Sequence, residues 1–182
     1  MLTPAQRAAL VQVARAKASE AARGVGPTDA GPAPEGLGAP GAAFVTVRVG
    51  GALRGCIGTF ERRDPLWETV AEMATAAAAR DPRFAPLVAR DLPALGVEIS
   101  VLAPARRIHG PDEIALGRDG LEVRRGLRHG LLLPQVASDH GLDRETFLAE
   151  TCRKAGLPAQ AWLEPDTEIW AFEAEVFGEP SA

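Results

Sequence analysis

The amino-acid sequence predicts an α+β fold, with an antiparallel or mixed sheet and helices packed against it. Strand-like and helix-like segments interleave along the chain. The first pair of strands, 43–49 and 52–59, is separated only by Gly50-Gly51, which is a two-residue hairpin turn. Because a hairpin makes its two strands antiparallel, we expect an antiparallel or mixed sheet.

Two helices and a linker surround this hairpin in the sequence. Residues 4–22 are rich in Ala with apolar residues near helical spacing, and Gly24 ends this first helix. Its polar side chains are expected to face solvent, among them Lys17. Segment 23–42 follows, and because 10 of its residues are Gly or Pro, it predicts an exposed linker. After the hairpin, Asp64-Pro65 predicts an N-cap and first-turn proline for a helix that reaches about Arg80.

The second half of the chain adds shorter elements. Val97, Ile99 and Val101 alternate with other residues and predict a strand with one buried face. Residues 105–118 are mixed and predict no clear element. The remaining segments predict two short strands, two helices and a closing strand, at 121–124, 131–133, 134–141, 143–155 and 168–177.

Composition narrows the classes of function. The formal net charge of −4 gives the chain no general attraction to nucleic acid or anionic membranes, and no apolar run is long enough to span a bilayer. The N-terminus does not resemble a signal peptide. Only Cys56 and Cys152 are present, which is no disulfide framework, so a cytoplasmic location with both thiols free is expected. Cys152 lies on the apolar stripe of its predicted helix and is interpreted as a core residue.

The segment 53–60, with the sequence LRGCIGTF, carries the most chemical information. Glycine inside a strand usually marks a bulge or a close approach, and Gly55 and Gly58 are expected to leave Cys56 sterically open. Arg54 falls on the same face as Cys56, where a guanidinium stabilises a thiolate and also binds a carboxylate or phosphate. The helix start at Asp64-Pro65 is a second potential anion site. Two interpretations stay open: a reactive or ligand-contacting thiol, or a small cysteine buried where strand and helix pack closely.

Other candidate positions are weaker. Asp81 is expected to cap a turn and Arg83 to pair locally, unless both line a cleft. Glu98 and Ser100 share the face of their strand opposite its apolar residues, and they are site candidates only if that face lines a cleft. No metal site is expected, because no short helical or knuckle spacing relates the histidines, which are His109, His129 and His140. A Cys–His pair formed by folding stays open.

These residues carry a resemblance to the AMMECR domain family, also called AmmeMemoRadiSam system protein A. The segment LRGCIGTF resembles the signature of that family over residues 53–60. Further similar blocks follow in the family's order at 44–46, 81–84, 97–102, 119–121, 131–137 and 152–157. The resemblance spans nearly the whole chain and implies one domain over 1–182, with the linker inside it.

The resemblance also implies two unequal lobes, the larger built from both chain ends and the smaller from the middle. It makes 53–60 the suspected functional site, although the family has no settled activity and no cofactor follows. It further implies a pathway shared with Memo-type dioxygenase-like proteins and radical-SAM proteins.

The first hypothesis is an enzyme or enzyme subunit for a small anionic ligand, with Cys56 as the reactive thiol and contacts from Arg54, Gly55, Gly58, Thr59, Asp81, Arg83, Ser100 and Gln135. The alternative is a non-catalytic module that docks a Memo-type or radical-SAM partner through the same segment. The sequence leaves the oligomeric state open.

Overall fold

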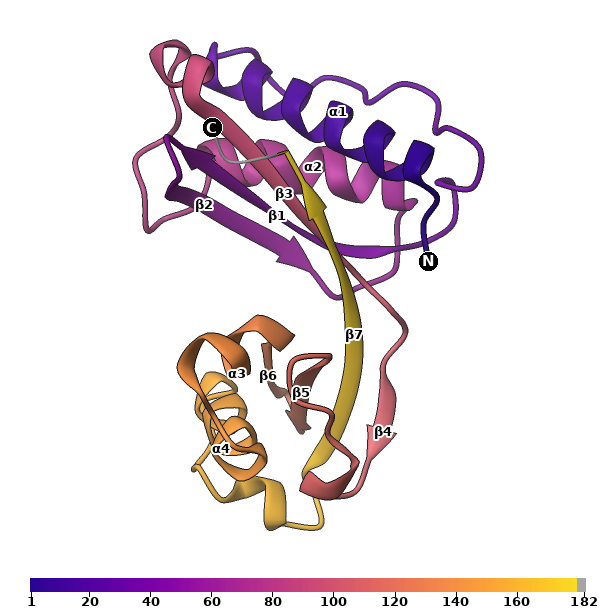
Figure 1. Cartoon of the computed structure of the whole chain (residues 1–182), viewed down its shortest axis with the longest axis vertical. Helices are drawn as coiled ribbons and strands as arrows, with labels where there is room; N and C mark the ends of the chain where they lie inside the picture. The colour runs from indigo at the N-terminus through magenta and orange to yellow at the C-terminus, as the bar shows by residue number, and fades with distance from the viewer. Residues whose placement is uncertain (180–182) are drawn as a thin grey trace. The chain divides into compact units, whose positions relative to one another are not determined.

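The computed structural model describes residues 1–179 and has the predicted α+β fold. The chain forms two compact units. The larger contains residues 1–102 together with the C-terminal stretch from 175, and the smaller contains residues 103–174. A larger lobe from both chain ends and a smaller lobe from the middle are therefore confirmed. The elements of each unit are labelled in Figure 1.

In the larger unit, two helices cover one face of an antiparallel sheet (Figure 1). The strand order is β2, β1, β3, followed by the C-terminal end of β7. The bounds are α1 Pro4–Ala22, β1 Ala42–Val49, β2 Ala52–Thr59, α2 Leu66–Ala79, β3 Leu95–Leu102 and β7 Glu168–Gly178. Gly50 and Gly51 both have positive φ, 57° and 78°, as a type I′ hairpin requires, so the predicted turn is confirmed. Burial of Val45, Val47 and Ile99 against the helices forms the core.

Helix α2 begins one residue later than predicted, and its cap is a different one. Its N-cap is Pro65, and no side chain caps the helix, so the predicted Asp64 cap is wrong. The N–H groups of Leu66 and Trp67 instead donate to the carbonyls of Ala39 and Leu37, at 2.9 and 3.2 Å. Because the linker already occupies these donors, the predicted anion site at this helix start is absent.

The linker follows the helices as a strap. Most residues of 23–42 are exposed, but Leu37 is fully buried. The indole N–H of Trp67 donates to the carbonyls of Ala30 and Gly31, both at 3.1 Å. Side-chain and backbone hydrogen bonds therefore hold the strap against α2, even though its composition rules out regular structure.

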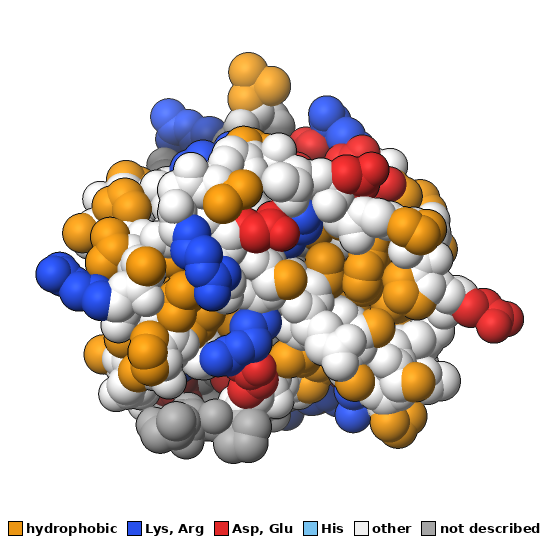
Figure 2. Space-filling model, turned by 90° about the horizontal axis from the view of Figure 1, so that it is seen from above, with side chains coloured by type: hydrophobic (Ala, Val, Ile, Leu, Met, Phe, Trp, Pro, Cys, Tyr) orange, Lys and Arg blue, Asp and Glu red, His pale blue; other side chains and the backbone are white. Residues whose placement is uncertain are grey.

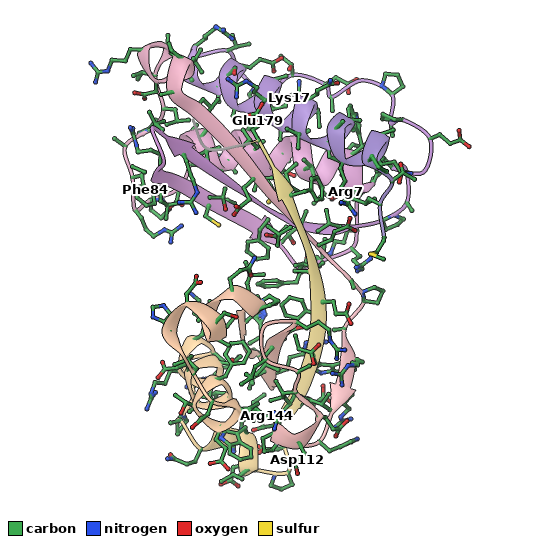
Figure 3. All side chains as sticks on the ribbon, in the orientation of Figure 1. Arg7, Lys17, Phe84, Asp112, Arg144 and Glu179 are labelled. Carbon is green, nitrogen blue, oxygen red and sulfur yellow. The ribbon has the colours of Figure 1, made fainter. Side chains whose placement is uncertain are left out.

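Lys17 is the second anchor of the strap, and its predicted exposure is wrong. The side chain is buried, and Nζ donates to the carbonyls of Thr28 and Asp29 at 3.2 and 2.8 Å. It also forms an ion pair with Glu20 at 3.1 Å. Figure 3 shows Lys17 on α1, from which the ammonium reaches these oxygens. Helical periodicity could not reveal this role, because the partner carbonyls come from the irregular segment.

The opposite end of α1 is tied to the C-terminal part of β7. Arg7 Nη2 lies 2.6 Å from a carboxylate oxygen of Glu175, and the backbone N–H of Leu2 donates to the other oxygen at 3.0 Å. Arg7 is labelled on α1 in Figure 3. The last strand of the chain is thereby fixed to the first helix within the larger unit.

In the smaller unit, a four-stranded antiparallel sheet has the order β4, β7, β5, β6. The bounds are β4 Arg106–Ile108, β5 Asp119–Arg125, β6 Arg128–Leu132, α3 Pro134–His140 and α4 Arg144–Lys154. Short 3₁₀ segments complete the fold at Ala89–Ala94 of the larger unit and at Pro111–Glu113 and Ala161–Leu163 of the smaller one. The core joins Leu121 of β5, Phe147 and Leu148 of α4 and Ile169 of β7. The region 105–118, for which no element was predicted, contains β4 and one 3₁₀ turn.

A buried carboxylate organises the start of β5. Asp119 accepts hydrogen bonds from Arg106 at 2.6 Å, from Arg118 at 3.0 Å and from the backbone N–H of Ala115 at 3.0 Å. Burial alone would raise the pKa of Asp119, but the hydrogen bonds and the two guanidinium charges outweigh it and lower that pKa. Asp119 is therefore a charged structural residue.

The surface mixes charge types. On the face shown in Figure 2, basic side chains are interspersed with acidic and hydrophobic ones. Within residues 1–179, no helix combines the length and the apolar character that crossing a membrane requires.

We predict that Lys17→Met loosens the strap. Methionine keeps most of the apolar volume but removes the ammonium that satisfies the carbonyls of Thr28 and Asp29. We expect the free energy of unfolding to fall by about 1–3 kcal/mol in urea titrations, with faster proteolysis within 24–41. Arg23→Met, at an exposed position, is the matched control and should change neither. Equal stability of the two variants would contradict the anchoring role.

Candidate functional site

The two glycines of LRGCIGTF are required by close packing on opposite faces of β2. A Cβ atom on Gly55 would lie 1.9 Å from the carbonyl oxygen of Ala77 in α2. A Cβ atom on Gly58 would lie 2.2 Å from the ring of Phe44 in β1. The expectation that these glycines leave open space around Cys56 is therefore wrong, because α2 and Phe44 fill that space.

Cys56 lies half-buried on the sheet face that α1 and α2 do not cover. It is paired across the sheet with Thr46, whose hydroxyl donates a hydrogen bond to the cysteine Sγ at 3.3 Å. Thr46 is in turn opposite Glu98 of β3, and Phe44 of the same face is opposite Ser100. The register thus places Glu98 and the buried Ser100 on the sheet face that carries Cys56. Their alternation with apolar residues predicts only that these two share a face.

An ion pair closes the outer edge of β2 at Cys56. Strand β2 is the first strand of its sheet, so the peptide groups of Cys56 that point away from β1 have no strand partner. The N–H of Cys56 donates to Oδ2 of Asp81 at 2.9 Å, and its carbonyl accepts from Nη2 of Arg83 at 3.2 Å. Asp81 and Arg83 therefore replace the missing strand at this residue.

The same two side chains are bound to each other through a bidentate contact. Nε and Nη2 of Arg83 lie 3.0 and 2.7 Å from the two carboxylate oxygens of Asp81, which also accepts the backbone N–H of Arg83 at 3.1 Å. The predicted turn cap and local pair are both present. We call this unit, Asp81 with Arg83 on the Cys56 peptide, the edge clip.

The edge clip fixes the charges around Cys56. The hydrogen bond from Arg83 holds the pKa of Asp81 well below its usual range; burial opposes this shift, and the N–H groups of Cys56 and Arg83 add to it. The pKa of Arg83 is raised, first by its hydrogen bond to Asp81 and to a smaller extent by the charge of Cys56. Asp81 therefore stays ionised and paired, which makes it unsuitable as a general base.

Arg83 is also the cation that ligands can reach. Its side chain is 57% exposed, and its Nη1 makes no hydrogen bond to any group within residues 1–179. The guanidinium lies 5.3 Å from the ring centroid of Phe84, which Figure 3 shows on the larger unit. An anion that approaches Cys56 from the edge of β2 can thus bind a preoriented guanidinium.

Arg54 has a carboxylate partner that sequence reasoning missed. Its Nη2 lies 3.7 Å from Asp91 and 3.5 Å from the carbonyl of Ala85, so it joins β2 to the segment after α2. Thr46 was also missed. A cross-strand partner of Cys56 follows from the hairpin register, and counting back from Gly50-Gly51 would have narrowed the choice to a few residues of β1.

The remaining candidate residues make other contacts than those of the edge clip. Thr59 ends β2, and its hydroxyl accepts the N–H of Glu61 at 3.1 Å. Gln135 is the second residue of α3 in the smaller unit, where its Oε1 is buried without a hydrogen-bond partner among the described residues. The three histidines also belong to the smaller unit, and within residues 1–179 no three metal-ligating side chains gather.

Cys152 is a core residue, as predicted. It is fully buried on α4, and burial raises the pKa of its thiol. This thiol is therefore held in its neutral form and is protected from reagents.

Comparison with known proteins identifies the family. The family model described as AMMECR1 matches residues 11–177 of this chain. A protein of Thermococcus gammatolerans is 51% identical over 133 residues, which cover 70% of this chain and 65% of that protein. A protein of Methanothermobacter thermautotrophicus is 45% identical over 142 residues, 75% of this chain and 74% of its own length. The matched part is thus just under two thirds of the Thermococcus relative.

A solved structure shows the same fold. The crystal structure of an uncharacterised protein from Pyrococcus horikoshii superposes with a TM-score of 0.87 at 41% identity, over 94% of this chain and 90% of that one. With a family match that includes both units and the whole LRGCIGTF segment, this chain belongs to the AMMECR1 family.

Proposed function

We propose that this protein is an enzyme, or a subunit of one, that binds a small anionic molecule at the edge of β2 and uses Cys56 as its reactive thiol. One observation carries the proposal: the half-exposed Cys56 and the half-exposed guanidinium of Arg83 are held together by the edge clip. A nucleophile and an anion-binding group thus occupy fixed positions on a rigid element.

Two polar groups adjoin Cys56. The hydroxyl of Thr46 donates to Sγ at 3.3 Å, and the guanidinium of Arg83 donates to the Cys56 carbonyl at 3.2 Å. The guanidinium is thereby placed to bind the negative charge of a ligand that approaches the cysteine. Arg54, Gly55, Gly58, Thr59 and Ser100 remain candidate ligand contacts under this proposal, and no cofactor is required by it. Gln135, which belongs to the smaller unit, has no part in it.

The proposal includes the wider setting that the family resemblance implies. The ligand would belong to a cytoplasmic pathway shared with Memo-type dioxygenase-like and radical-SAM proteins, and both cysteines of the fold are free thiols. The whole chain, 1–182, would act as one domain. Strand β7 supports this, because it pairs with β3 of the larger unit and with β4 and β5 of the smaller one.

A second candidate function is a module that docks a Memo-type or radical-SAM partner. Leu53 is 37% exposed beside Arg54, and Val88 is 41% exposed in the segment that Arg54 contacts. A partner protein on this surface would bury both aliphatic side chains beside an arginine, a residue type that is enriched at protein interfaces. This candidate uses the same segment but needs no reactive thiol.

A pair of alkylating reagents tests the anion-binding thiol. Iodoacetate and iodoacetamide differ mainly in charge, so the ratio of their rates at Cys56 reports the local electrostatic field. We expect Arg83→Gln to lower the iodoacetate-to-iodoacetamide ratio by about two- to fivefold, measured by mass spectrometry of native protein. Cys152 should stay unlabelled because it is fully buried.

The matched control for this test is Arg90→Gln, at an exposed position, which should leave the ratio unchanged. Cys56→Ser should abolish labelling. If native Cys56 resists both reagents, the reactive-thiol proposal is lost. If Leu53→Ser with Val88→Ser then abolishes co-elution with a purified partner protein, the docking function is favoured instead.

Asp81→Asn tests the edge clip. The amide removes the charge that holds Arg83 and the N–H of Cys56, and we expect the free energy of unfolding at pH 7 to fall by about 1–3 kcal/mol. Because the folded-state pKa of Asp81 is depressed, its stabilisation is complete above the unfolded pKa of about 3.9 and is lost as pH falls further. The stability gap between wild type and variant should therefore be constant from pH 7 to about 5 and shrink below about 4.

Urea titrations of both proteins at several pH values measure this gap. Asp64→Asn, an exposed aspartate in the same unit, is the matched control and should show no such gap. A gap that persists unchanged at pH 3 would show that the carboxylate charge of Asp81 is not what stabilises the fold.

A further inference from the structure

The smaller unit has a concave surface of its own. A groove of about 560 Å³ lies between the end of β6, helix α3 and helix α4. Its apolar lining consists of Leu132, Val136 and Leu142. We call it the α3–α4 groove; Figure 1 shows the two helices that border it.

The apolar floor of this groove is the outer surface of the core. Leu132, Val136 and Leu142 are each half-buried and pack from outside on the cluster that contains Phe147 and Ile169. One side of each aliphatic chain is therefore covered, while the other faces the groove. The floor thus already presents an apolar surface to the groove.

The rim of the groove carries an excess of positive charge. Its polar side chains are His140, Glu150, Arg153 and Lys154. Arg153 forms an ion pair with Glu150, which neutralises both. The side chains of Lys154 and His140 make neither a hydrogen bond nor an ion pair with any group within residues 1–179, and both are exposed. Lys154 is thus an uncommitted cation, and His140 an uncommitted hydrogen-bond donor, beside an apolar floor.

We propose that the α3–α4 groove binds a small carboxylate with an aliphatic body. The volume of about 560 Å³ lies within the range for small-molecule sites, about 300–1,000 Å³. The floor accepts the hydrocarbon part, and the rim, with one uncompensated lysine, complements a single negative charge. A neutral hydrocarbon would leave Lys154 unused, and a cation would be repelled by it.

Octanoate is the probe, and 1-octanol is its uncharged counterpart of equal chain length. Both are titrated into the full-length protein while methyl NMR signals of Val136 and Leu142 are followed. We expect saturable shifts for octanoate, with affinity lowered about two- to fivefold or more by Lys154→Glu. The same substitution should leave the weaker binding of octanol unchanged.

Two variants serve as controls for this test. Lys154→Arg keeps the charge and should keep the affinity, and Arg90→Glu reverses an exposed charge in the other unit and should have no effect. Because Lys154 is exposed and unpaired, its variants are expected to fold normally, which circular dichroism checks.

Three results would overturn the proposal. One is the absence of saturable shifts at the groove methyls up to about 10 mM octanoate, because a dissociation constant above that concentration is far weaker than ordinary ligand binding. Another is octanol binding as tightly as octanoate, which would make the groove a site for neutral apolar groups. The third is an octanoate affinity that Lys154→Glu does not change.

Discussion

The bidentate pair of Asp81 and Arg83 is the interaction on which the LRGCIGTF segment depends. It satisfies the two outward peptide groups of Cys56 on an edge strand and so fixes β2 to the turn that follows α2. The pair can reach Cys56 only because α2 approaches β2 closely. Gly55 allows this approach, since any Cβ atom there would overlap the carbonyl of Ala77. Gly55, on one face of β2, thus allows Asp81 and Arg83 to contact the Cys56 peptide at the edge of the strand.

Much of the fold followed from local patterns, whereas its anchors did not. The Gly50-Gly51 turn, the strand alternation around Ile99 and the helical stripe of α1 are properties of short windows, and the structure confirms them. The cap of α2 and the burial of Lys17 depend instead on carbonyls of the strap, which lie far away in the sequence. An irregular segment has no periodicity, so its path cannot be read from its residues.

In the candidate site, too, contacts between neighbouring residues were predictable, and contacts between residues far apart in the sequence were not. Local reasoning on residues 81–84 correctly predicted the turn cap and the Arg83 pair, because those partners are two residues apart. It could not show that the pair also holds Cys56, which is 25 residues earlier than Asp81. The partners Thr46 and Asp91 were missed for a related reason, since strand register and loop path decide them. The glycines were correctly marked as close-approach positions, but the sequence could not show what approaches them.

The commitment of Asp81 to the edge clip limits the chemistry available to Cys56. A depressed pKa and a full set of hydrogen bonds prevent this carboxylate from accepting a proton near neutral pH. Within the described part of the larger unit there is no histidine either, so a Cys–His pair cannot form inside that unit. Glu98 is the carboxylate that the sheet register places on the same face, one strand beyond Thr46. In the proposed function, Cys56 therefore has the hydroxyl of Thr46 at its sulfur and the guanidinium of Arg83 at its carbonyl, whereas Asp81 is not available as its base.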